Sequence, residues 1–225
     1  VERVHLAKDT QWGAHPADVL QAAIAHAVAP QGVGGLEALR LFREVLLPAC
    51  RPMDDPMNLA YVPTAPSVAS TMFDLVVSAS SIFGGNWEAG AGAIAAENQA
   101  LRWLADLAGF PPDAGGVFVS GGSAANLSAL VTAREVFTQR RGGRPPRYTV
   151  AVTEEVHASV RAAARVMDVD VLPVHTDAHG RMTGAALDAA LHEHEHDSVF
   201  AVVATGGTTN AGVIDDLDAA ADVAA

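Results

Sequence analysis

The sequence predicts an α/β fold in which a mainly parallel sheet is flanked by helices. From residue 116 onward, short apolar segments alternate with helical segments of about 10 to 15 residues, the pattern of strand–helix–strand units. Half of the residues are hydrophobic and 18% are charged, a composition typical of a globular domain with a sizeable core. A chain of 225 residues is long enough for one such domain preceded by an N-terminal arm.

The first part of the chain, residues 1–66, is predicted to be a helical arm. Apolar residues recur at helical spacing over 18–29 and 35–47, with Asp18 as a candidate N-cap. Prolines between residues 48 and 56 then break this pattern and produce an irregular stretch. We therefore expect a boundary near the end of this stretch.

The main domain is predicted to occupy residues 67–225. Helices are expected over 67–83 and 89–108, followed by a strand at 116–119 and a helix at 124–139. The remaining predicted elements are strands at 148–152, 169–174 and 198–204, and helices at 157–167, 184–194 and 217–225. Ligands of such sheets bind in the loops that follow the carboxyl ends of the strands, so these loops are where chemistry is expected.

Composition and charge exclude several classes of function. The net charge of −12, from 14 basic and 26 acidic side chains, argues against nucleic acid or an anionic membrane as the main partner. Cys50 is the one cysteine, so an internal disulfide and a cysteine-based metal site are excluded. The start of the chain does not resemble a signal peptide and no apolar run approaches membrane-spanning length, so we expect a cytoplasmic protein.

The first loop with candidate chemistry is Ser-Gly-Gly-Ser-Ala-Ala-Asn at residues 120–126. Gly122 lets the backbone approach a ligand, the start of the following helix offers N–H donors, and Ser123 adds a hydroxyl. These features predict an anion site, although a simple glycine turn capped by Ser123 would have the same sequence. The spacing matches neither a Walker A loop nor a dinucleotide fingerprint.

Two further loops follow predicted strands. His157 begins a helix, and its flat ring is suited to stacking on an aromatic ligand; the alternative is a surface or capping histidine. Residues 204–212 are rich in small and hydroxyl side chains, including Thr208, and Asp215 follows as a candidate N-cap or site residue. A flat, phosphorylated heteroaromatic cofactor would use all three loops.

A histidine-rich segment at residues 192–196 satisfies the H-E-x-x-H pattern of zinc proteases. A catalytic zinc needs a third protein ligand and a dry cleft, whereas this segment ends an alanine-rich helix. We therefore expect a solvated helix end and no metal.

Five motifs in order carry a resemblance to a known family. They are Tyr-Val-Pro-Thr at 61–64, Gly-Gly-Asn-Trp-Glu at 84–88, and the runs at 120–127, 156–160 and 204–212. In order and spacing, residues 55–225 resemble the group II pyridoxal-phosphate-dependent decarboxylases, the family of aromatic-L-amino-acid and glutamate decarboxylases. The resemblance implies a fold-type I large domain, of which this chain holds an incomplete first part.

The resemblance also implies roles for individual residues. Gly122 and Ser123 would hold the phosphate of pyridoxal 5'-phosphate. His157 would stack on the pyridine ring and help to position or protonate the substrate, Thr208 would contact the cofactor, and Asp215 would have a supporting role. The residues implied to border the substrate pocket are Tyr61, Pro63 and Thr64, with Phe83 and Gly85 contributed across a dimer interface.

The implied reaction is decarboxylation of an L-amino acid to an amine and CO2 by a carboxy-lyase that works as a homodimer or with a chain carrying the missing half. Ala124 stands where an acidic residue is common in the family, and Gly85 is small where aromatic-specific relatives carry a ring. The Schiff-base lysine and the aspartate that binds the pyridine nitrogen are expected beyond Ala225, because the one lysine, Lys8, has a different context. An aldehyde-forming relative and a non-catalytic structural or regulatory subunit are the alternatives.

Overall fold

The computed structural model describes residues 13–53, 55, 58, 61, 66–194 and 196–225. The chain forms two compact units, Val1–Ala93 and Ile94–Ala225. The division lies within helix α4 (Trp87–Leu107), whereas the prolines placed the expected boundary at 66/67. The assignment of all of 67–225 to one cofactor-binding domain stays a prediction.

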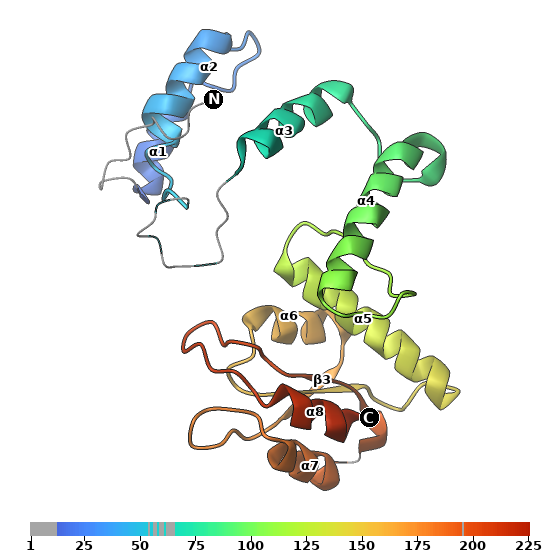
Figure 1. The fold of residues 1–225 in the computed structure, drawn as a ribbon. Coiled ribbons are helices and arrows are strands. Elements are labelled where there is room, and N and C mark those ends of the chain that lie inside the picture. The colour runs from blue at the N-terminus through green and yellow to red at the C-terminus, as the bar shows by residue number, and fades with distance from the viewer. Residues whose placement is uncertain (1–12, 54, 56–57, 59–60, 62–65, 195) are drawn as a thin grey trace. The chain divides into compact units, whose positions relative to one another are not determined.

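The described residues of the first unit are mainly helical. Its helices are α1 (Ala17–Ile24), α2 (Gly35–Leu41), the π-helical turn η2 (Phe42–Leu46) and α3 (Val68–Ser80), after which α4 begins (Figure 1). Pro16, whose φ of −55° suits a helix start, is the N-cap of α1. Asp18 lies in the first turn, so its prediction as the N-cap was wrong. Within the described part of the chain, no helix combines the length and hydropathy needed to cross a membrane.

The second unit contains the predicted α/β alternation. After α4 come α5 (Gly122–Arg141), β1 (Thr149–Val152), α6 (Ala158–Met167), β2 (Asp170–Pro173), α7 (Gly184–Glu193), the 3-10 turn η3 (His196–Ser198), β3 (Val199–Val203) and α8 (Leu217–Ala224). The strands form a sheet in the order β2-β1-β3, and both pairs are parallel. The expected parallel sheet flanked by helices is therefore confirmed.

Alternate side chains of β1 pack on opposite faces of this sheet. Val150 and Val152 contact a buried cluster that includes Leu130 of α5 and Val160 of α6. Ala151 belongs to the cluster on the other face, with residues of α7 and α8. The two-residue period of a strand thus produces three layers, with α5 and α6 on one side and α7 and α8 on the other (Figure 1).

The outer edge of β2 is protected by a proline. The backbone N–H groups of Asp170 and Val174 point toward β1, where they bond to Tyr148 and Val152. Pro173 therefore has its missing N–H on the side away from β1, where no hydrogen bond is lost. Such a proline disfavours the addition of a further strand at this edge.

The strand predicted at 116–119 is not formed, and that prediction was wrong. Residues Gly116 to Val119 are extended but belong to none of the described strands. The N–H of Phe118 instead donates to the carboxylate of Glu97 on α4, 3.2 Å away, and the apolar side chains of this segment are exposed. A strand requires a partner strand, and a short apolar run cannot reveal whether one is present.

Candidate active site

A cleft of about 430 Å³ lies at the carboxyl ends of β1 and β3. His157, which follows β1, lines it together with Thr209 and Asn210, which follow β3. This is the edge of a parallel sheet where ligands bind. Two of the three sequence-predicted loops therefore meet at one cleft.

His157 is the N-cap of α6 and is exposed to solvent. Its Nδ1 accepts a hydrogen bond from the backbone N–H of Ser159, at 3.2 Å. The ring therefore caps its own helix, so the capping role considered for it is real. Because the ring also lines the cleft, capping leaves it available to a ligand.

The start of α5 lies beside the start of α6. Nδ2 of Asn126 on α5 donates to Oγ of Ser159 on α6, at 2.7 Å. Gly121, the N-cap of α5, has φ of 156°, a backbone conformation that side-chain-bearing residues rarely adopt. The third predicted loop is thus joined to the start of α6, which His157 caps.

No side chain caps α5, which leaves its first-turn N–H groups without that partner. Ser123 is exposed in this first turn, so the capping role considered for it is absent. Free N–H donors at the positive end of a helix, with a hydroxyl beside them, match the chemistry of a phosphate.

The loop after β3 folds back on itself, and this determines where Thr208 points. Gly206 and Ile214 form an antiparallel bridge, and the N–H of Thr208 donates to the carbonyl of Val213. Thr208 is only 4% exposed, and its hydroxyl accepts from the N–H of Val213 at 3.1 Å. A direct contact of Thr208 with a cofactor stays a prediction.

Thr209 and Asn210, rather than Thr208, line the cleft beside His157. Sequence reasoning missed both residues, although they belong to the same Thr-Thr-Asn run. The burial of one threonine and the exposure of its neighbour depend on the fold of the loop, which the hydroxyl-rich composition does not specify.

Asp215 is buried and holds two loops together. Its carboxylate oxygens accept from the N–H groups of Met182 and Thr205, each at 2.7 Å. The N-cap of α8 is Asp216, which accepts from the N–H of Ala219. The N-cap prediction for Asp215 was therefore wrong by one residue, and its supporting role toward a cofactor stays a prediction.

Three charged residues also line the cleft: Glu154, Glu155 and Arg161. The guanidinium of Arg161 on α6 donates to the carbonyl of Thr153, at the end of β1, over 3.3 Å. Sequence reasoning missed Arg161 because it lies one helical turn beyond His157, outside the loop motif.

The residues predicted to border a substrate pocket lie in the first unit. Tyr61 is exposed with φ of 66°, and Pro63 and Thr64 lie outside the described residues. Phe83 and Gly85 are neighbours, since a Cβ at Gly85 would overlap the ring of Phe83. The roles of all five residues stay predictions.

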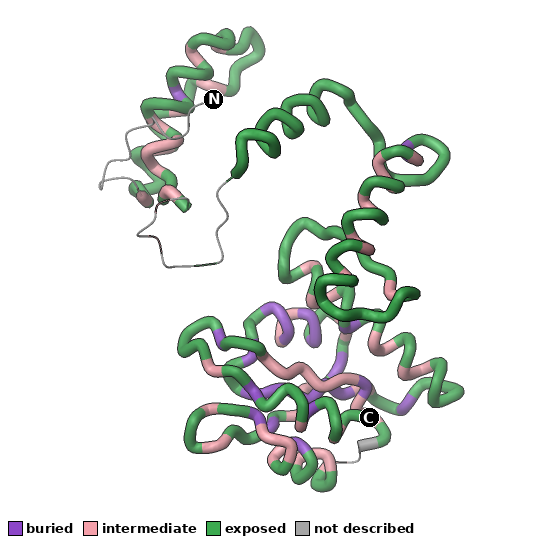
Figure 2. The backbone as a smooth tube through the Cα atoms, viewed as in Figure 1, coloured by how far each residue is buried: buried purple, intermediate pink, exposed green. Residues whose placement is uncertain are grey.

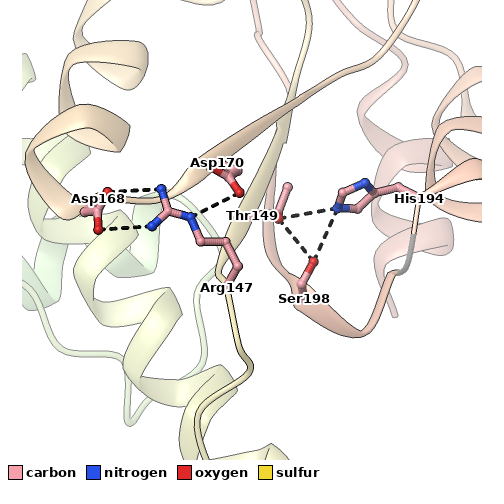
Figure 3. A network of polar contacts seen from close by, with 6 residues as sticks. All are labelled: Arg147, Thr149, Asp168, Asp170, His194 and Ser198. Carbon is pink, nitrogen blue, oxygen red and sulfur yellow. Dashed lines mark hydrogen bonds and ion pairs between the residues drawn. The ribbon is translucent and has the colours of Figure 1, made fainter.

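The histidine-rich segment does not form one helical face. Helix α7 ends at Glu193, and Nδ1 of His192 lies 2.8 Å from the carbonyl of Asp188. Nε2 of His194 instead lies within 3.4 Å of the hydroxyls of Thr149 and Ser198 (Figure 3). Among the described residues, no group of three potential metal ligands is found.

A second polar cluster in Figure 3 joins Arg147 to Asp168 and Asp170. Arg147 contacts both oxygens of Asp168, at 3.0 Å each, and these hydrogen bonds lower the pKa of that carboxyl. The cluster ties the start of β1 to the start of β2, at the sheet end opposite the cleft. It is a structural contact between loops.

Comparison with known proteins identifies relatives of the chain. Residues 35–225 match the family model described as the pyridoxal-dependent decarboxylase conserved domain. The chain is 31% identical over 211 residues to an aromatic-L-amino-acid decarboxylase of Bacillus atrophaeus, an alignment covering 92% of this chain and 43% of that protein. It is 33% identical over 177 residues to an L-2,4-diaminobutyrate decarboxylase of Rhizobium meliloti, covering 76% and 35%.

Solved structures show the same fold. The TDC of Oryza sativa with PLP and tryptamine superposes with a TM-score of 0.80 at 25% identity, covering 95% of this chain and 50% of that one. A glutamate decarboxylase domain from Vibrio parahaemolyticus superposes with a TM-score of 0.84 at 24% identity, covering 96% and 50%. The chain thus spans half or less of each of these relatives. The match of the family model over residues 35–225 shows that this chain belongs to the pyridoxal-dependent decarboxylase family, whose cofactor is pyridoxal phosphate.

Proposed function

We propose that this chain supplies the phosphate-binding loop and the ring-stacking histidine of an enzyme that decarboxylates an L-amino acid to an amine and CO2. The observation that carries the proposal is the meeting of three loops at one end of the sheet. Asn126 joins the start of α5 to that of α6, and His157 shares a cleft with the loop after β3.

Each loop would make a different contribution. The first-turn N–H groups of α5 at Gly122 and Ser123 would hold the phosphate. His157 would lie against the pyridine ring, and the Thr209–Asn210 edge would border it. When bound, pyridoxal phosphate supplies the electron sink that accepts the electron pair released as CO2 leaves. The protein would orient the carboxylate and stabilise the developing charge.

Membership of the family does not determine which class of amino acid is the substrate. One relative is named for aromatic L-amino acids and another for L-2,4-diaminobutyrate, so membership alone does not choose between a ring and a charged chain. Phe83 lying over Gly85 favours an apolar pocket wall, if these residues border the substrate as proposed.

We further propose that the cofactor-binding lysine and the aspartate for the pyridine nitrogen lie outside this stretch. Lys8 is the one lysine of the chain and lies in its polar start. On this proposal the chain alone binds the cofactor without turnover, and activity requires a polypeptide or assembly that also carries the lysine. A dimer in the cytoplasm is part of the same proposal.

The test is product analysis with a panel of L-amino acids, using the protein together with its lysine-bearing part. Release of CO2 with equal amounts of an amine supports the proposal. His157→Gln is expected to lower turnover by roughly a hundredfold or more. His179→Gln, an exposed histidine in the β2–α7 connection, is the matched control and should leave turnover unchanged.

Two results would replace the proposal. An aldehyde with ammonia would identify an aldehyde-forming relative. Stable assembly with no turnover of any amino acid, in both wild type and His157→Gln, would identify a structural or regulatory subunit.

A further inference from the structure

The ring of His157 is held by its Nδ1 edge. Nδ1 lies 3.2 Å from the backbone nitrogen of Ser159, with the geometry of a hydrogen bond, and 2.7 Å from Oγ of the same residue. A backbone N–H can only donate, so Nδ1 must present its lone pair. In the neutral ring the proton therefore lies on Nε2.

The direction of the next hydrogen bonds follows from this tautomer. Because Nδ1 has no proton to give, the Ser159 hydroxyl must be the donor of the 2.7 Å contact. Its oxygen then accepts from Nδ2 of Asn126, also at 2.7 Å. Ser159, at the centre of this chain from Asn126 to His157, is buried, and both of its side-chain hydrogen bonds are partly buried.

Asn126 also connects the histidine to the proposed phosphate loop. It lies three residues after Ser123 on α5, so the two side chains are on neighbouring positions of the helix surface. Asn126 therefore links the proposed phosphate loop to the ring of His157 through two hydrogen bonds. This arrangement joins residues 33 positions apart in the sequence.

We infer that Asn126 and Ser159 are positioning residues that fix His157 as the Nε2–H tautomer, so that the ring offers a hydrogen-bond donor to the cleft. This inference rests on the proposed function for its catalytic consequence but not for its structural part. With Nδ1 engaged by α6, the opposite edge of the ring is the one available to the cleft that His157 lines. His157 then acts on a bound carboxylate as a hydrogen-bond donor from Nε2 and not as a base.

The tautomer can be read directly by long-range ¹H–¹⁵N NMR of protein labelled at histidine nitrogens, in which a protonated and an unprotonated ring nitrogen have well-separated shifts. His157→Gln identifies the signals of this ring. The expected result for wild type without cofactor is the Nε2–H form. A wild-type ring that carries its proton on Nδ1 would overturn the inference.

The matched variant is Asn126→Asp, which keeps the shape of the side chain but can only accept. The Ser159 hydroxyl would then donate to residue 126, which leaves Nδ1 with only the longer bond from the backbone N–H, so the share of the Nδ1–H form of His157 should rise above that in wild type. Ser159→Ala removes the hydroxyl and should act in the same direction. Ser128→Ala, an exposed serine on α5, is the control and should leave the tautomer unchanged.

The catalytic part is tested separately, with the lysine-bearing protein. Asn126→Asp is expected to lower kcat on the order of tenfold, the loss of about one hydrogen bond, while KM changes less. Absence of CO2 release in wild type would reject the proposed function, whereas the NMR result would still decide the hydrogen-bond chain. An unchanged tautomer in both Asn126→Asp and Ser159→Ala would reject the chain even if the enzyme is active.

Discussion

Leu187 in α7 and Leu75 in α3 are both leucines within helices, but Leu187 is fully buried and Leu75 is 65% exposed. The same contrast holds for the two units. The second unit has an apolar cluster on each face of its sheet, whereas among the described residues of Val1–Ala93 only Leu41 and Gly90 are buried, and only Leu41 has an apolar side chain to bury (Figure 2). Helix α3 has no buried residue, although many of its side chains are apolar.

This contrast shows where the chain's own residues can supply stability. The second unit buries apolar surface on both faces of the sheet and therefore stabilises the loops of the candidate site. Exposed apolar side chains such as Phe73 and Val76 contribute little to the stability of the chain as described. An apolar surface of this kind is a feature of interfaces, in agreement with the proposed dimer.

The largest effect is expected for truncation in the buried region. Leu187→Ala should lower the free energy of unfolding by about 3 kcal/mol, because it leaves a cavity between α7 and the sheet. Leu75→Ala should change it by less than about 0.5 kcal/mol. Urea denaturation of both variants measures the difference. Equal losses of free energy of unfolding in the two variants would show that α3 is covered in solution and would contradict the difference between the two units.

Asp215 and Asp216 are neighbours in sequence, but Asp215 is buried between two loops and Asp216 caps α8 at the surface. Asp215→Asn should lower the free energy of unfolding by about 2 kcal/mol, because one of the two N–H groups that donate to the buried Asp215 loses its carboxylate acceptor. Asp216→Asn should be nearly neutral, since asparagine caps a helix as well as aspartate does. The same denaturation experiment applies, and a larger loss for Asp216→Asn would contradict the assignment of the two roles.

In the loop before α5, the backbone conformation of Gly121, and not its burial, should determine how much a substitution lowers stability. Gly121→Ala meets no neighbouring atom, yet its φ of 156° should cost about 1 kcal/mol. Gly115→Ala, equally unobstructed and with φ outside the region that favours glycine, is the control. In thermal unfolding, the melting temperature of Gly121→Ala should be lower than that of Gly115→Ala. The reverse order would contradict the positive φ at Gly121.

The smallest effect is expected for ion pairs at the surface, where the carboxyl pKa should be lowered in both units alike. In the second unit, the N–H of Arg181 and then its guanidinium lower the pKa of Asp177 from 3.8 to about 2. In the first, hydrogen bonding to Arg40 lowers the pKa of Glu37 from 4.5 to about 2. Both pKa values are lowered in the folded state. Each ion pair therefore stabilises the folded state at pH values above the usual carboxyl pKa, and this contribution is lost as the pH falls toward 2.

Carboxyl-carbon NMR titration measures both midpoints. Values near 2 in both units are expected, and a small loss of stability should accompany the approach to that pH. A normal midpoint for Glu37 alone would mean that the first unit does not hold even its local contacts in solution.

The sheet was predictable because its evidence is local. Alternating apolar strands and helices predict β1, β2 and β3, and no predicted strand end differs from the observed one by more than one residue. The failure at 116–119 has a physical reason, since strand formation depends on a partner distant in sequence. The cap predicted at Asp215 was displaced because the neighbouring Asp216 can fill the same role, whereas α1 begins before Asp18, directly after Pro16.

The site was predictable only as a set of loops. Glycine and hydroxyl residues after strands identified 120–126, His157 and 204–212, and the structure brings these together. The orientation of Thr208 and the lining by Thr209 and Arg161 depend on how the chain packs. The contact of Asn126 with Ser159 joins two helices, and no local sequence pattern predicts it.

On the proposed function, three turns distant in sequence bind one phosphorylated ring. The most direct measurement is titration of the protein with pyridoxamine 5'-phosphate, which has no aldehyde and so cannot react with Lys8, while amide and histidine NMR signals are followed. Saturable shifts at the N–H groups of Gly122 and Ser123, at the ring of His157 and at Asn210 are the predicted result. Shifts confined to residues elsewhere, or none up to millimolar ligand, would contradict the account.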